Sequence, residues 1–127
     1  MQTSYDKSNI FARIIRGEIP SIPVYADDKV IAINDLHPAA PTHVLVMPRG
    51  EYISFDDFVF KASKDDVQNF FLKVREIAHF LGLEDSGYRL IANHGSDASQ
   101  TVPHFHVHIL GKKKLGALVS GDNHHSK

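Results

Sequence analysis

Three histidines stand at alternate positions near the end of the chain: His104, His106 and His108. Apolar residues separate them. Successive side chains of a β-strand point to opposite faces, so a strand over residues 102–111 would place all three imidazoles on one face, about 6.6–6.8 Å apart. The apolar residues would then pack on a core from the other face. A strand that needs only a polar outer surface more usually carries Thr, Lys or Glu, so this row of titratable nitrogens calls for a chemical explanation.

Three explanations fit such a row. Imidazole is the commonest metal ligand and also the side chain best suited to acid–base work near neutral pH. A zinc ion needs ligands that converge on one point, whereas side chains at alternate positions of a flat strand point in parallel. An extended anion such as a phosphate group suits the row better, because one imidazole can attack while its neighbours donate hydrogen bonds to the oxygens. An exposed strand that carries histidines by chance is the third reading.

Composition narrows the class of protein. The chain has 127 residues, which is enough for one domain, and we expect a core over about residues 8–116 with a polar tail at 117–127. A net charge of −1 provides no basic field for nucleic acid. Cysteine is absent, which excludes thiolate chemistry and fits a reducing compartment. Met1 to Asn9 has no apolar segment of signal-peptide length and no run could span a membrane, so we expect a cytoplasmic protein.

Periodicity predicts the elements that must position the histidines. A short helix over Ile10–Ile15, capped by Ser8 or Asn9, and a long helix that follows Ser63 and ends at Gly82 show apolar residues at helical spacing. Residues 54–60 carry only a weak helical pattern. Besides the histidine stretch, strands are expected at residues 24–26, 29–34, 43–47 and 88–93. Short connections and grouped helices predict an α+β fold, with a mainly antiparallel sheet of about five strands and one long and one short helix.

The histidine stretch resembles the motif that names the histidine triad (HIT) superfamily: histidine and apolar residues in alternation, followed by two apolar residues. Other segments are similar to the Hint branch (histidine triad nucleotide-binding proteins) and occur in the same order. They are Asn9-Ile10-Phe11, Gly17-Glu18-Ile19-Pro20, Asp35 with Pro38, Ala40-Pro41-Thr42-His43, Asn93-His94-Gly95 and Gln100-Thr101-Val102. Ordered matches over residues 8–116 are more specific than one motif.

The resemblance implies an HIT-like fold, a homodimer, and hydrolysis of purine nucleoside 5′-phosphoramidates or acyl-nucleotidylates without a metal or other cofactor. It implies that His106 is the nucleophile on the α-phosphorus and forms a nucleotidyl-histidine intermediate. It implies that His108 and His43 bind the phosphate and handle protons, and that His104 supports the triad. It also implies that Asp35 holds the ribose hydroxyls. Further nucleotide-binding positions are Ile10, Phe11, Ile14, Ile19 and Ile33 for the base, and Asn93, Ser99 and Thr101 for the phosphate and leaving group.

Simpler roles remain open for several of these positions. Asp35 could cap a turn, the apolar set could be core only, and His43 could be a half-buried structural histidine. The chain also departs from the family pattern: Ser99 replaces a common glycine, and Gly111-Lys112-Lys113 replaces Gly-Gly-Arg. Substrate preference therefore stays open, as do three other functions: a nucleotide-binding regulatory protein with little turnover, a dinucleoside polyphosphate hydrolase and a zinc-binding protein.

Overall fold

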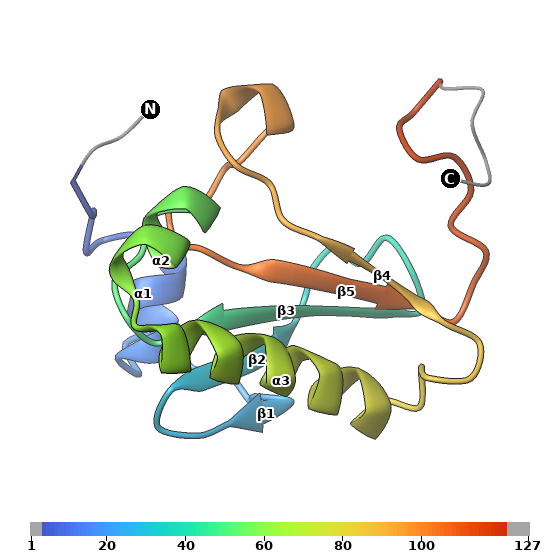
Figure 1. The fold of residues 1–127 in the computed structure, drawn as a ribbon, viewed down its shortest axis with the longest axis horizontal. Helices are drawn as coiled ribbons and strands as arrows, with labels where there is room; N and C mark the ends of the chain where they lie inside the picture. Colours follow the sequence, from blue (N-terminus) through green and yellow to red (C-terminus); the bar gives the residue numbers. More distant parts are fainter. Residues whose placement is uncertain (1–3, 122–127) are drawn as a thin grey trace.

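The computed structural model describes residues 4–121 and contains one five-stranded antiparallel sheet (Figure 1). The strands are β1 (Tyr25–Ala26), β2 (Val30–Asn34), β3 (Thr42–Pro48), β4 (Tyr88–Ile91) and β5 (Val107–Gly111), in the spatial order β1-β2-β3-β5-β4. The α-helices are α1 (Ile10–Ile15), α2 (Phe55–Lys61) and α3 (Lys64–Phe80), and a 3₁₀ turn, η1, spans Ser96–Ala98. The predicted α+β class and antiparallel sheet are confirmed, and α2 adds a helix to the two expected. Residues 122–127 of the predicted tail lie outside the described residues.

Side-chain caps set the beginnings of α1 and α3. The side chain of Asn9 accepts a hydrogen bond from the backbone N–H of Ala12, and the Ser63 hydroxyl accepts one from the N–H of Asp66. Each cap satisfies one of the N–H groups that the first helical turn leaves without a partner. The helix α3 ends before Gly82, whose φ of 75° gives the chain the left-handed turn that glycine adopts readily.

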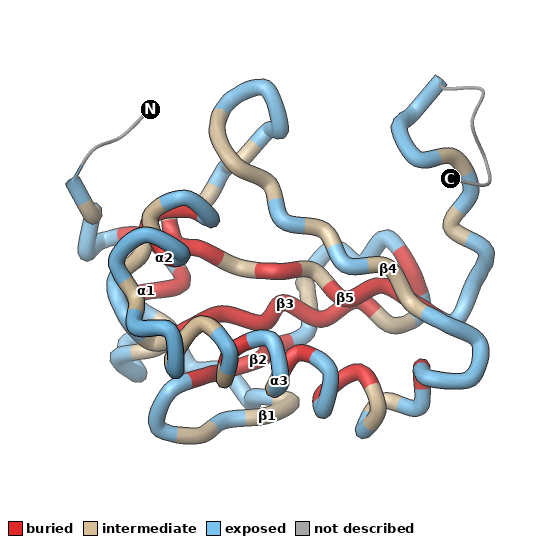
Figure 2. Tube along the Cα trace, viewed as in Figure 1, coloured by how far each residue is buried: buried red, intermediate tan, exposed pale blue. Residues whose placement is uncertain are grey.

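The sheet separates two apolar clusters, and β3 is buried along both faces, as its unbroken apolar run predicted (Figure 2). On one face, α3 packs Val74 and Ile77 with strand residues such as Val44 and Ile109. On the other face, Phe11 of α1 packs with strand residues that include Ile33, Leu45 and Met47. Because Leu45 of β3 pairs with His108 of β5, His108 faces the α1 side of the sheet.

The histidine stretch departs from the predicted strand. Strand β5 begins only at Val107, so residues 102–106 are irregular and the expectation of a strand over 102–111 was too long. The backbone N–H of Phe105 bonds to the carbonyl of Tyr52, 2.7 Å away, instead of to β3, and Pro103 has no N–H to give. The alternation of faces nevertheless continues through the irregular part: Phe105 joins the α3 cluster while His104 and His106 contact Phe11 on the other side.

Among residues 4–121, no helix combines the length and apolar character that a membrane crossing requires.

Candidate active site

A cavity of about 460 Å³ opens on the α1 side of the sheet, and its wall includes His106 and His108. Helix α1, strand β2 and the segment after η1 contribute to the wall. All nine residues that the resemblance named for nucleotide binding line it: Ile10, Phe11, Ile14, Ile19, Ile33, Asp35, Asn93, Ser99 and Thr101. Apolar side chains thus share one cavity with three imidazoles, those of His37, His106 and His108, and with a carboxylate and hydroxyls. Such a combination suits a ligand with an apolar ring and an anionic group.

Hydrogen bonding decides which nitrogen of His106 carries the proton. Its Nδ1 lies 2.7 Å from the backbone carbonyl oxygen of His104. A carbonyl oxygen only accepts, so Nδ1 holds the proton and Nε2 keeps a free lone pair. Burial lowers the pKa of His106, which keeps the ring neutral. The ring of Phe11 packs edge-on against it, with centroids 4.9 Å apart. The ring of His106 is therefore neutral, with an unprotonated Nε2 that is chemically able to act as a nucleophile.

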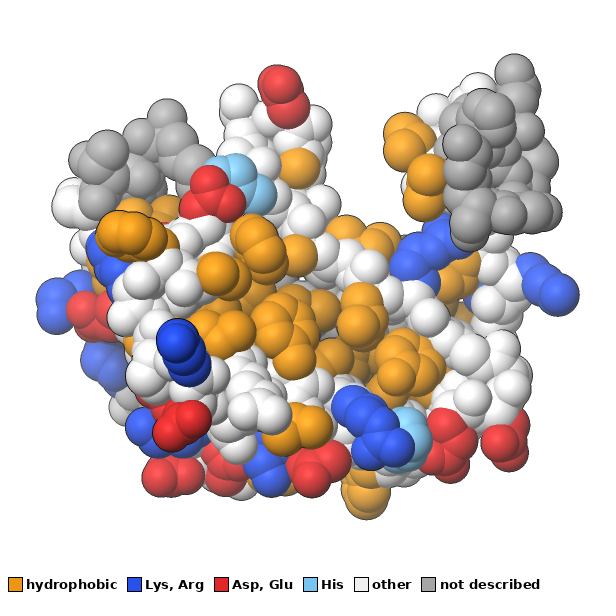
Figure 3. All heavy atoms as spheres, in the orientation of Figure 1, with side chains coloured by type: hydrophobic (Ala, Val, Ile, Leu, Met, Phe, Trp, Pro, Cys, Tyr) orange, Lys and Arg blue, Asp and Glu red, His pale blue; other side chains and the backbone are white. Residues whose placement is uncertain are grey.

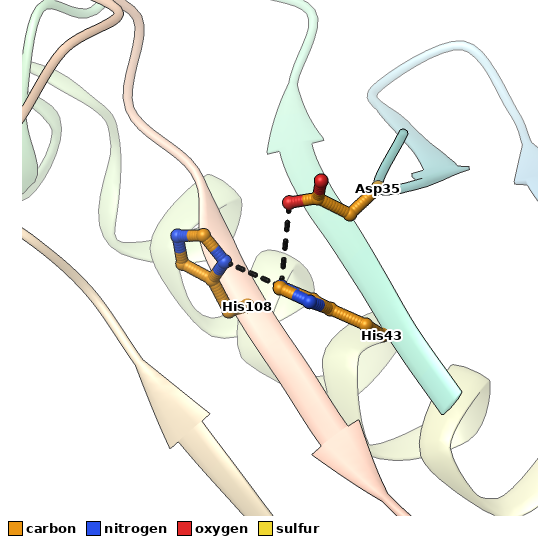
Figure 4. A group of neighbouring side chains, drawn as sticks. All are labelled: Asp35, His43 and His108. Atoms are coloured by element: carbon orange, nitrogen blue, oxygen red, sulfur yellow. Dashed lines mark hydrogen bonds and ion pairs between the residues drawn. The ribbon is translucent and has the colours of Figure 1, made fainter. Parts of the chain in front are cut away.

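His43 and His108 form a second hydrogen-bonded unit (Figure 4). The N–H of Ala39 donates to Nδ1 of His43 over 2.9 Å, so the proton of His43 must be on Nε2. This Nε2–H is 2.8 Å from Nδ1 of His108 and 3.4 Å from a carboxylate oxygen of Asp35. His108 accepts at Nδ1 and consequently carries its own proton on Nε2. The chain of bonds thus ends in an N–H on the cavity wall, 3.5 Å from the side-chain nitrogen of Asn93, which can only donate and so leaves the His108 N–H available to a ligand.

The same three side chains could in principle hold a metal, because the ligand atoms of Asp35, His43 and His108 all lie within 4.8 Å of one another. The hydrogen bond from Ala39 argues against it. A neutral imidazole that binds a metal through Nε2 carries its proton on Nδ1, where His43 already accepts the N–H of Ala39. The arrangement suits a chain of proton donors and acceptors better than a metal site.

His104 is fully buried behind the cavity wall, with 0 % of its surface exposed. Its Nε2 lies 2.8 Å from the carbonyl oxygen of Pro48, and its Nδ1 lies 2.6 Å from the hydroxyl of Tyr5. Burial lowers the pKa of His104 to about 4. The ring is thus neutral and held at both nitrogens, away from any substrate in the cavity, while its backbone carbonyl orients His106.

Sequence reasoning missed three residues that organise this site. Tyr5 lies 99 positions from His104, so no local pattern signals that contact, and Ala39 bonds to His43 through its backbone N–H, which its side-chain type does not indicate. Gln100 stood in one of the quoted motifs without a role. Its side chain accepts from the N–H of Gly95 and donates to the carbonyls of Ile53 and Val102, so it holds the loop between β4 and the histidines in shape.

Ser99 adopts the left-handed conformation, with φ 58° and ψ 39°, in the wall of the cavity. This conformation costs a residue with a Cβ roughly 1–2 kcal/mol, whereas glycine pays about 0.5–1 kcal/mol in extra chain entropy. We therefore expect Ser99→Gly to raise the free energy of unfolding by about 0.5–1 kcal/mol, measured by urea titration. Ser96→Gly, in η1, is the matched control and should lower it. If both variants had a lower free energy of unfolding than the wild type, the backbone of Ser99 would not be strained.

The buried histidines also predict how stability depends on pH. In the folded protein the pKa values of His104 and His108 are about 4, mainly because of burial, against an ordinary value of 6.5. Between these pH values the unfolded chain binds more protons, so stability is full above about pH 6.5 and falls as the pH drops toward 4. Melting temperatures between pH 7.5 and 4.5 should show this fall. His108→Gln should make it shallower, and an unchanged slope would contradict the assignment.

Comparison with known proteins gives a consistent result. The family model described as "HIT domain" matches residues 16–115. The chain is 44% identical to an uncharacterized HIT-like protein of Rickettsia prowazekii over 119 residues, and this alignment covers 94% of this chain and 99% of that protein. It is 38% identical to the purine nucleoside phosphoramidase of Escherichia coli K12 over 114 residues, and this alignment covers 90% of this chain and 95% of that protein. A histidine triad protein structure from Clostridium difficile superposes with a TM-score of 0.80 at 43% identity, over 90% and 98% of the two chains.

Proposed function

The chain belongs to the HIT domain family, and from this premise we propose that it hydrolyses purine nucleoside 5′-phosphoramidates and acyl-nucleotidylates through a nucleotidyl-histidine intermediate. One observation carries the proposal: the bond from Nδ1 of His106 to the carbonyl of His104 leaves Nε2 unprotonated in a cavity that also offers an N–H donor on His108. The phosphoramidase activity of the Escherichia coli relative supports the substrate class.

In the first half-reaction, Nε2 of His106 attacks the α-phosphorus, a P–N bond to histidine forms, and the bond to the leaving amine or acyl group breaks. The Nε2–H of His108 donates to the phosphate group, where negative charge grows in the transition state. A leaving amine takes a proton from Nε2 of His108 as the bond to phosphorus breaks, and the His43–His108 pair, joined by a 2.8 Å hydrogen bond, regains one proton from the water that attacks in the second half-reaction. Splitting one displacement into two lowers each barrier.

In the second half-reaction, water attacks the phosphorus, and the P–N bond to His106 breaks to release the nucleoside monophosphate. The wall of the cavity accounts for the rest of the nucleotide. Its apolar residues from α1 and β2 can enclose a purine, and the carboxylate of Asp35 can accept hydrogen bonds from the ribose. One oxygen of Asp35 already accepts the N–H of His37 at 2.8 Å, which holds the carboxylate in place and leaves lone pairs for a ligand.

The protein would act as a homodimer, as the family resemblance implied. Strand β4 lies at one end of the sheet and pairs only with β5 in the described part of the chain. Its Leu90 is exposed, and so is Phe71 of helix α3. Figure 3 shows hydrophobic side chains gathered on the face between α3 and β4. A second copy could cover this apolar surface and the open strand edge, and light scattering of the full chain would measure the mass.

A single-turnover experiment tests the proposed function. Excess enzyme is mixed with adenosine 5′-phosphoramidate, quenched in alkali at short times, and examined by intact mass. We expect a transient adduct of one AMP and release of AMP on the same timescale. No adduct and no turnover, with AMP still bound at equilibrium, would contradict the proposal and favour a nucleotide-binding regulatory role. Faster turnover of a dinucleoside polyphosphate would instead assign the other enzymatic alternative.

A further inference from the structure

In the described part of the N-terminal segment, residues 4–9, the side chain of Tyr5 contacts the histidine triad without lining the cavity. Its hydroxyl oxygen lies 2.6 Å from Nδ1 of His104, and the two rings pack edge-on with centroids 5.7 Å apart. The segment itself is anchored to α1. The side chain of Asn9 donates to the carbonyl of Asp6, and a guanidinium N–H of Arg16 donates to the carbonyl of Lys7 over 2.8 Å.

The direction of the Tyr5 bond follows from the other side of the ring. The carbonyl of Pro48 can only accept, so the single proton of neutral His104 is on Nε2. Nδ1 therefore carries a lone pair, and the hydroxyl of Tyr5 must be the donor. No other hydrogen bond reaches Nδ1 of His104 within residues 4–121, and the ring is fully buried, so the hydroxyl of Tyr5 is the partner of this nitrogen in the described structure.

We propose that Tyr5 is a positioning residue for the nucleophile, acting through His104. Tyr5 and Pro48 hydrogen-bond to the two nitrogens of the His104 imidazole, and these two bonds set the position of the His104 backbone. The carbonyl of that same residue accepts the Nδ1–H of His106 over 2.7 Å and so keeps the attacking lone pair on Nε2. Phe11 supports the arrangement, because its ring contacts those of both His104 and His106.

This inference rests on the proposed function, since it concerns the orientation of a nucleophile. It predicts an effect on the chemical step and not on nucleotide affinity, because Tyr5 lies outside the cavity wall. A small displacement of a reacting group can cost a large factor in rate even when the substrate binds normally. Removal of the Tyr5 hydroxyl should therefore lower kcat and change the hydrogen bonding of the His104 ring.

The test is Tyr5→Phe, which removes the hydroxyl and keeps the ring. The residue is half-buried in the N-terminal segment, so the fold should survive, and the melting temperature checks this. We expect kcat for adenosine 5′-phosphoramidate to fall about tenfold while the dissociation constant of AMP changes less than twofold. In ¹⁵N NMR spectra of the imidazoles, the Nδ1 signal of His104 should move toward that of a free unprotonated nitrogen, with the proton still on Nε2.

Tyr25→Phe is the matched control, because it removes a hydroxyl that donates to Asp27 over the same 2.6 Å, away from the triad. Its kcat and His104 signals should stay at the wild-type values. The inference is overturned if Tyr5→Phe matches Tyr25→Phe in kcat, if the loss appears in AMP affinity instead, or if the His104 signal does not move. Failure of the proposed function would look different: the wild-type enzyme itself would show no turnover, while the NMR measurement would still test the Tyr5 bond.

Discussion

Replacing His106 by alanine is expected to reduce turnover of adenosine 5′-phosphoramidate by on the order of 10⁴-fold or more, the scale seen when a covalent nucleophile is removed. The substitution removes the Nε2 lone pair that the His104 carbonyl orients, so the nucleotidyl-histidine cannot form. AMP should still bind, because the apolar wall and Asp35 remain in place. Steady-state kinetics, equilibrium binding of AMP and the mass of quenched enzyme would measure the three consequences together.

A matched control for this variant is His79→Ala, at the end of α3, where the histidine pairs with Glu84 at 2.6 Å and is remote from the cavity. It should retain both turnover and the AMP adduct. If His106→Ala still formed an adduct of one AMP, or kept more than about a tenth of the wild-type rate, another residue would have to be the nucleophile. Loss of AMP binding in His106→Ala would show that the ring is needed for the shape of the cavity.

His108→Ala is expected to lower kcat by about 10²–10³-fold, the typical cost of losing one preorganised donor to a transition state. The variant loses the Nε2–H that faces the phosphate group and also breaks the proton chain from His43. The nucleophile remains, so an AMP adduct should still form, but slowly. Single-turnover kinetics would show the reduced rate of adduct formation, and leaving groups of lower pKa should recover part of it because they need less help from a proton.

A double-mutant cycle tests whether His43 and His108 act as one unit. Because their rings are joined by a 2.8 Å bond, the combined His43→Ala and His108→Ala variant should lose little more than His108→Ala alone. Independent roles would instead give losses that multiply. An effect of His108→Ala confined to KM would contradict the assignment of this residue to the transition state and would leave it a binding role only.

Much of the fold was predictable because local rules dominate it. The caps at Asn9 and Ser63 and the apolar spacing of α3 are set by residues three or four apart, so the helices formed where the pattern placed them. The burial of β3 on both faces followed from its unbroken apolar run. The start of β5 did not follow, because the partner of the Phe105 amide is Tyr52, more than fifty residues away, and no local pattern encodes that bond.

The sequence by itself determined the family and the side of the sheet on which the three histidines lie, because the period of two places alternate histidines opposite the apolar residues and the accompanying motifs are those of the HIT family. Only the tertiary structure decided the protonation of the site. His43 is bonded by the N–H of Ala39, and His104 by the Tyr5 hydroxyl and the Pro48 carbonyl. His106 bonds to the backbone carbonyl of His104. A ring nitrogen is a donor or an acceptor according to what faces it. The loop before β3 and the irregular stretch before β5 bring up the neighbouring partners of His43 and His106, and packing between distant segments brings Tyr5 and Pro48 to His104.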